Sequence, residues 1–228
     1  MRDLRQIQPP AGADPRALDA DVRGALRPLG PAIADRVAAH LVAAGELLDR
    51  DPAAALEQAR VARAFAARIG VVREAVGLAA YAAAAWAEAL AELRAERRLT
   101  GSVTHLPVMA DCERGLGRPQ RALELAQSAD VRDLDEPGRI EMLIVASGAR
   151  RDLGQPAAAV VSLQAALGDR DHPQPWSARL WYAYADALLA AGRQAEAVEW
   201  FAAVAEIDYG DTDAEERLLT LEPNSPGP

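Results

Sequence analysis

The chain has 228 residues, half of them apolar and only 4% aromatic, so its core must be aliphatic and rich in alanine. All 25 residues of the lysine and arginine class are arginine, which excludes Schiff-base lysines and the phosphate-binding lysine of a P-loop. The net charge of −9 argues against partners that are nucleic acids or anionic membrane surfaces.

The amino-terminal part of the chain carries no hydrophobic stretch of the kind found in signal peptides. Residues 1–15 are polar and contain prolines, so we expect them to be flexible, whereas residues 16–28 predict a short helix that covers the segment after it. The single cysteine, Cys112, cannot form an internal disulfide, and no apolar run approaches the ~20 residues that span a bilayer. These features predict a cytoplasmic protein.

Similar phrases recur along the chain at steps of 33 to 38 residues. The clearest are LGRPQRALELA (116–126), LGQPAAAVVSL (153–163) and AGRQAEAVEWF (191–201). Aligning these three phrases with two weaker copies upstream gives one residue per copy at the predicted turn, which we call the anchor. The five anchors are Arg50, Ala84, Gly117, Gly154 and Gly192. Five copies with a period near 34 predict a stack of helix pairs, each pair joined by a turn at its anchor.

Small residues gather in columns when the copies are aligned on their anchors. Five residues after the anchors stand Ala55, Ala89, Ala122, Ala159 and Ala197. Seven residues before them stand Ala43, Gly77, Ala110, Ser147 and Ala185. Twelve residues after them stand Ala62, Glu96, Ala129, Ala166 and Val204. Small side chains at these spacings allow two antiparallel helices to approach closely, so we expect the columns to lie between the helices of each pair.

The last copy, WYAYADALLAAGRQAEAVEWFAAVAEID (181–208), resembles the tetratricopeptide repeat, a 34-residue helix–turn–helix unit. Phrases such as HLVAAGELLDRDPAAAL and MADCERGLGRP are also similar to uncharacterised repeat proteins of actinobacteria, a likeness that implies no activity. The resemblance implies an all-α fold, a right-handed α-solenoid of about five helix pairs with terminal capping helices. It places one domain at 16–222, pairs at 36–69, 70–102, 103–135, 140–174 and 178–208, a capping helix at 211–221 and a disordered tail at 223–228.

Several residues depart from the repeat pattern. Glu46, Glu113 and Arg150 stand where the family usually has a bulky apolar residue, and Arg73 stands where Trp181 does in the last copy. We therefore expect helices to be rotated or splayed at these places.

The sequence offers little that resembles a catalytic centre. His105 and Cys112 share one face of a predicted helix but lie roughly 10 Å apart along its axis, which argues against a dyad or a shared metal. Cys112 is therefore predicted to be a small interior residue. We find neither a G-x-S-x-G elbow nor a glycine-rich phosphate loop. We predict that the protein is not an enzyme and uses no cofactor or metal.

In the tetratricopeptide family the first helix of each pair lines a concave groove. We call the residues of the first helices that face this groove the stripe. The corresponding positions of this sequence give ten candidate binding residues: His40, Glu74, Tyr81, Asp111, Arg114, Glu141, Arg151, Arg179, Tyr182 and Asp186. Two interpretations stay open. The charges and tyrosines hold a protein or peptide partner, or they pair with one another across neighbouring helices.

One binding mode of the family is excluded by composition. Chaperone-adaptor repeats grip a terminal carboxylate with lysines and asparagines, but this chain has no lysine and its only asparagine is Asn224. The predicted function is a non-catalytic scaffold or adaptor that binds a protein or peptide in its groove. The alternative is a regulator whose groove holds a small charged metabolite or a signalling peptide. Homo-oligomer formation stays open.

Overall fold

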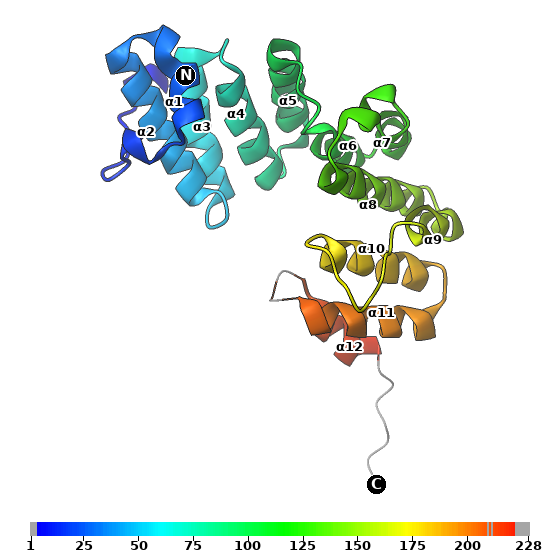
Figure 1. Ribbon diagram of the computed structural model, residues 1–228. Coiled ribbons are helices and arrows are strands. Elements are labelled where there is room, and N and C mark those ends of the chain that lie inside the picture. Colours follow the sequence, from blue (N-terminus) through cyan, green and yellow to red (C-terminus); the bar gives the residue numbers. More distant parts are fainter. Residues whose placement is uncertain (1–3, 209, 211, 222–228) are drawn as a thin grey trace. The chain divides into compact units, whose positions relative to one another are not determined.

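The computed structural model describes residues 4–208, 210 and 212–221, and Figure 1 shows the helices of this part of the chain. The regular elements of the described residues are helices without any strand, which confirms the predicted all-α fold. Internal contacts divide the chain into two compact units, one ending at Leu116 and the other beginning at Gly117. Each unit is described separately below.

The first unit consists of helices that follow one another in antiparallel pairs, preceded by short 3-10 segments. The segments are η1 (Leu4–Gln6), η2 (Pro15–Ala17) and η3 (Arg27–Leu29). The helices are α1 (Ala20–Leu26), α2 (Pro31–Leu47), α3 (Pro52–Ala66), α4 (Gly70–Ala82), α5 (Trp86–Thr100) and α6 (Leu106–Gly115). Helix α2 packs on α3, α3 on α4, and α4 on α5, as expected for stacked repeats.

The second unit repeats this arrangement. Its elements are α7 (Pro119–Ala126), η4 (Ala129–Asp133), α8 (Glu136–Asp152), α9 (Pro156–Gln164), α10 (Ser177–Ala190), α11 (Gln194–Ile207) and α12 (Ala214–Leu221). Helix α12 lies within the region predicted for the capping helix and packs on α11. The predicted tail at 223–228 lies outside the described residues. Trp181 and Phe201 are fully buried in the core that joins α10 and α11.

Four of the five predicted anchors have the left-handed backbone of a helix-terminating turn. Their φ angles are 54° at Ala84, 71° at Gly117, 70° at Gly154 and 76° at Gly192. After three of them, the next N–H donates to the carbonyl five residues back: Ala85 to Ala80, Gln155 to Arg150 and Arg193 to Leu188. This bond is that of the Schellman motif, which satisfies carbonyls that the helix end would otherwise leave without a partner.

The anchor at Arg50 turns differently. The N–H of Asp51 donates to the carbonyl of Leu47 over 2.8 Å, and the Asp51 carboxylate accepts from the N–H of Ala54 over 3.0 Å. The side chain of Asp51 thus caps α3, and Pro52 occupies the first turn of that helix, where it needs no hydrogen-bond partner.

The two columns of small residues nearest the turns are buried in every copy. A Cβ atom on Gly77 would lie 2.5 Å from Leu93 Cδ2, so α4 and α5 leave no room for a side chain there. In the second unit, Ser147 Oγ on α8 donates to the carbonyl of Ala159 on α9 over 3.3 Å. The small residues therefore let the helices of a pair approach each other closely.

The third column does not behave uniformly. Ala62, Glu96 and Val204 are buried, but Ala129 is exposed and Ala166 only half-buried. The reason is helix length, since α7 has 8 residues and α9 has 9, whereas α5 has 15 and α11 has 14. Both short helices end before they reach the column.

Part of the segment that was predicted to be flexible, residues 1–15, contacts the first helix pair at Arg5 and Ile7. Arg36 Nη2 on α2 donates to the carbonyls of Arg5 over 3.0 Å and Ile7 over 2.8 Å. Arg5 Nε in turn donates to the carbonyl of Ala64 on α3 over 3.0 Å. Arg36 thus satisfies two backbone carbonyls of the segment, and Arg5 satisfies one of α3.

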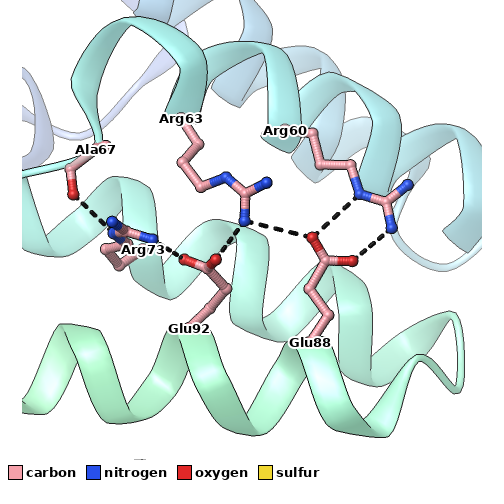
Figure 2. A network of polar contacts seen from close by, with 6 residues as sticks. All are labelled: Arg60, Arg63, Ala67, Arg73, Glu88 and Glu92. Carbon is pink, nitrogen blue, oxygen red and sulfur yellow. Dashed lines mark hydrogen bonds and ion pairs between the residues drawn. The ribbon is translucent and has the colours of Figure 1, made fainter. Parts of the chain in front are cut away.

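A polar network replaces apolar contact where Arg73 occupies the position of Trp181 (Figure 2). Arg73 Nη1 donates to Glu92 over 2.6 Å, and Arg63 donates to the other oxygen of Glu92, whose side chain is only 7% exposed. Glu88 accepts from Arg60 and from Arg63. The hydrogen bond from Arg60 lowers the pKa of Glu88, against the opposing effect of burial. Alternating charges thus join α3, α4 and α5.

The departure at Glu113 is also resolved by an arginine. Its side chain is 4% exposed, and Oε1 accepts from Arg94 Nη2 on α5 over 2.7 Å. A buried carboxylate needs such a partner, because an unpaired buried charge is strongly unfavourable. Reversing the charge of Arg94 would therefore place a second carboxylate beside the buried carboxylate of Glu113.

Candidate functional site

The first unit brings together three of the predicted groove residues. Tyr81 on α4 donates through its hydroxyl to Asp111 Oδ2 on α6 over 2.7 Å. Arg114, one turn further along α6, donates to Asp111 Oδ1 over 2.7 Å, and the Asp111 and Arg114 side chains are each 24% exposed. The Tyr81 ring also meets the Trp86 ring edge-on with centroids 5.4 Å apart. The result is a preorganised polar cluster at a partly exposed position.

A second contact of the same kind links α4 to the start of α6. Glu74 Oε1 lies 2.8 Å from His105 Nε2, and the Glu74 side chain remains 37% exposed. His105 was considered only in the search for a catalytic centre. His105 lies immediately before α6, where its side chain faces α4, the first helix of the preceding pair. That position in the sequence could have placed His105 among the predicted groove residues.

In the second unit, the more exposed of the ion pairs between predicted groove residues joins α8 and α10. Arg179 donates through Nε and Nη2 to the two oxygens of Glu141, over 2.7 and 2.8 Å. Two parallel hydrogen bonds of this kind are the preferred geometry between a guanidinium and a carboxylate. The Arg179 side chain is 63% exposed, so this pair lies open to solvent.

Asp186 is the centre of a less exposed cluster. One oxygen accepts from Arg151 Nη1 on α8 over 3.0 Å, and the other accepts from Arg217 Nη2 on α12 over 2.6 Å. Asp186 is thus bonded to helices on both sides of α10. Arg217, which belongs to the predicted capping region, could not be assigned to this cluster from the repeat pattern because the capping helix is not a repeat.

Tyr182 lies beside this cluster. Its hydroxyl donates to Asp213, and its ring meets the Phe201 ring edge-on with centroids 5.3 Å apart. Burial raises the pKa of Tyr182 above its usual value of 10, and the hydrogen bond to the Asp213 carboxylate together with the charge of Asp186 raises it further. The hydroxyl therefore keeps its proton at neutral pH and acts as a hydrogen-bond donor.

His40 is the predicted groove residue whose environment differs most from expectation. It is fully buried, and its Nδ1 atom lies 2.8 Å from Gln58 Oε1 on α3. A partner cannot reach such a side chain, so His40 is corrected from a groove-lining residue to an interior one. Burial extends to its neighbours on α2, such as Val37, which packs in a core with Leu26 of α1.

The other nine candidates all have a polar partner among the described residues, and in most cases that partner lies on a neighbouring first helix. This pattern agrees with the second interpretation of the stripe, in which the charges satisfy one another. Arg151 belongs to the second unit and pairs with Asp186, whereas Asp111 and Arg114 belong to the first.

The chemistry of the remaining candidates points away from a reactive centre. Cys112 is fully buried, and burial raises the pKa of its thiol to about 12. The described part of the chain contains no group of three or more His, Cys, Asp or Glu side chains placed to hold a metal ion. Among the same residues, no helix is both long and apolar enough to cross a membrane.

Comparison with known proteins identifies the repeat in the second unit. Residues 150–221 match the family model of the tetratricopeptide repeat. A search of curated proteins found no match to the chain. The matched segment extends from the end of α8 through α12. It contains Arg151, Arg179, Tyr182 and Asp186, so four of the predicted residues lie in the part of the chain whose family likeness is independently supported.

Proposed function

We propose that the protein is a non-catalytic adaptor of the cytoplasm that binds a protein or peptide through side chains of its first helices. Tetratricopeptide repeats generally mediate protein–protein interactions, and the all-α repeat fold is typically non-catalytic. The excess of acidic over basic residues supports a protein partner over a nucleic acid or a membrane surface.

The observation that carries the proposal is the open pair between Arg179 and Glu141. Exposed ion pairs contribute only about 0–1 kcal/mol to folding, so such a pair can open at little cost. Once open, it presents a guanidinium fork to a partner carboxylate and a carboxylate to a partner cation. The Asp186 cluster is less exposed and bonds three helices, so its role in this proposal is to fix α10 in place.

The chain offers a matched control for testing the Arg179 position. Arg193, in the turn before α11, also forms a pair through Nε and Nη2, with Glu196 three residues along the chain. Its side chain is 44% exposed, compared with 63% for Arg179. Both arginines therefore pair with a partly exposed carboxylate, but only Arg179 lies on the predicted stripe.

The test compares Arg179→Glu with Arg193→Glu. Wild-type protein is used as bait in lysate of its native host, retained proteins are identified by mass spectrometry, and affinities are measured by calorimetry with the purified partner. We expect Arg179→Glu to weaken binding at least tenfold, as expected for loss of a charge-assisted hydrogen bond, with unchanged helicity by circular dichroism. Arg193→Glu should bind like wild type. Equal affinities for all three proteins, or a loss confined to Arg193→Glu, would refute the stripe as the binding surface.

A further inference from the structure

A pocket of about 270 Å³ lies in the second unit, apart from the stripe residues. It is formed by α7, η4, α8 and α9, whose ribbons are labelled or coloured green in Figure 1. We call it the α8 pocket, and its lining residues are Leu123, Ala126, Gln127, Val131, Arg139, Met142, Leu143, Ala146, Arg150 and Ser162. Its volume is just below the ~300–1,000 Å³ of typical ligand sites, so it suits a small molecule.

The pocket lies beside two helices that are short for this array. Helices α7 and α9 end early, and the third column of small residues is not buried in these two copies. In the last pair the same column is filled by Val204, which is fully buried. Both short helices contribute to the pocket wall, α7 through Leu123 and Ala126 and α9 through Ser162. The wall is mostly aliphatic, with Leu123, Val131 and Leu143 among the lining residues.

Arg150 is the unusual member of this wall. In the last copy, the equivalent position is Leu188, which is fully buried in the core. Arg150 is half-buried, and within the described chain no acceptor lies within hydrogen-bond distance of its guanidinium group. Glu113 stands at the equivalent position of the third copy. It is buried, and its partner is Arg94. An arginine at a core-facing position normally needs an anion, because partial burial removes water from its charge.

The pocket contains a second arginine and no acid. Arg139 also lines it, and its Nη1 atom donates to the carbonyl of Leu134 over 2.6 Å. Aspartate and glutamate are absent from the lining residues given above. The site therefore combines uncompensated positive charge with an aliphatic wall, in a protein whose net charge is −9.

We propose that the α8 pocket binds a small aliphatic monocarboxylate, with the carboxylate on the Arg150 guanidinium and the hydrocarbon chain against Met142 and Leu143. A guanidinium fork matches a carboxylate in charge and geometry. The aliphatic wall selects for a hydrocarbon tail, since burying apolar surface is favourable, whereas a free phosphate or sulfate would gain nothing from it. This assignment is independent of the adaptor function, because it uses none of the stripe residues.

The binding probe is octanoate, with octanol as the neutral ligand of equal chain length. The protein has three methionines, so methyl labelling of methionine gives a reporter inside the pocket, Met142, and one buried in the first unit, Met109. We expect octanoate to shift the Met142 methyl signal in a saturable way and to leave Met109 unchanged. Octanol should bind at least tenfold more weakly. Equal binding of octanol, or no saturable shift at Met142, would overturn the proposal.

Two variants test the role of the arginine. Arg150→Met retains an unbranched side chain and places an apolar residue at a position that holds Leu188 in the last copy and Ala80 in the second. We expect it to fold and to bind octanoate about ten- to hundredfold more weakly, as loss of a charge-assisted hydrogen bond predicts. Arg132→Met removes an exposed arginine of η4 that does not line the pocket, and should bind like wild type. Unchanged binding in Arg150→Met would refute the assignment, and the wild-type methyl titration decides the matter if that variant is unstable.

A competition experiment distinguishes two sources of the carboxylate, a free small molecule and the carboxy terminus of a protein. A short peptide ending in leucine with a free carboxylate is compared with its carboxy-terminal amide as a competitor of octanoate. Displacement by the free acid alone would support the monocarboxylate site and assign it to a protein terminus. Failure of both peptides, with octanoate still bound, would support a free small carboxylate. Equal displacement by acid and amide would show that the carboxylate is not recognised and would overturn the proposal.

Discussion

Ala84 carries a backbone conformation that is unfavourable for its own side chain. Its φ of 54° is left-handed, and the residues at the three later anchors, with φ of 70° to 76°, are glycines. A residue with a Cβ atom loses about 1–2 kcal/mol in this conformation relative to its right-handed one, whereas glycine does not. The turn after α4 is therefore held by the helices on either side of it, against the preference of the alanine.

This strain gives a direct prediction for one substitution. Ala84→Gly should raise the free energy of unfolding by roughly 0.5–1 kcal/mol, because relief of strain exceeds the added entropy of the unfolded glycine. The matched control is Ala82→Gly, at the exposed last residue of α4, which should lower it by about 0.5–1 kcal/mol. Urea denaturation measures both. A loss of stability in Ala84→Gly would contradict the assignment of this turn.

At the scale of the helix pair, the buried alanines five residues after the anchors set how closely two helices approach. Ala159 and Ala197 have no exposed surface, whereas Ala158 and Ala195, on the same helices, are exposed. Ala159→Leu and Ala197→Leu should each destabilise by about 1–3 kcal/mol through overpacking. Ala158→Leu and Ala195→Leu should stay within about 0.5 kcal/mol of wild type. Thermal melts that fail to separate the buried from the exposed pair would argue against this packing.

These elements also show where sequence reasoning succeeds. Turn positions and buried small residues are local and repeat with the period, so alignment of the copies locates them. The early ends of α7 and α9 are not local, because Ala129 and Ala166 fit a helical pattern as well as Ala62 does. Nothing in the spacing reveals that the first two of these alanines lie beyond the helix end.

The candidate site was predictable to the level of the helix face but not to the level of the pairing. Tyr81 and Asp111 were assigned to first helices of successive copies, and they meet there. That Asp186 is shared with Arg217, however, depends on a helix beyond the last predicted pair. The burial of His40 depends on Gln58 and on the packing of the amino-terminal segments around α2, which have no repeat counterpart.

At the scale of the whole molecule, the end of the second unit is covered by α12, a single helix that follows the last predicted pair. Ala214 of α12 is buried, and Leu218 and Leu221 pack against the core formed by α10 and α11. Arg217 adds a hydrogen bond to Asp186, and its guanidinium lies 5.4 Å from the centre of the Phe201 ring. In a repeat protein each element is stabilised mainly by its neighbours, so loss of this helix should act locally.

Deleting residues 209–228 should therefore loosen the last helix pair first. Without α12 the Phe201 side of α11 meets water and Asp186 keeps only Arg151, so amides of α10 and α11 should exchange with solvent faster than in the full chain. Amides of α2 to α5 belong to the other compact unit and should keep their protection. Hydrogen exchange followed by mass spectrometry measures both sets of amides in one experiment. Equal acceleration in both units would mean that they unfold together, and unchanged exchange in α11 would mean that α12 does not stabilise the pair on which it packs.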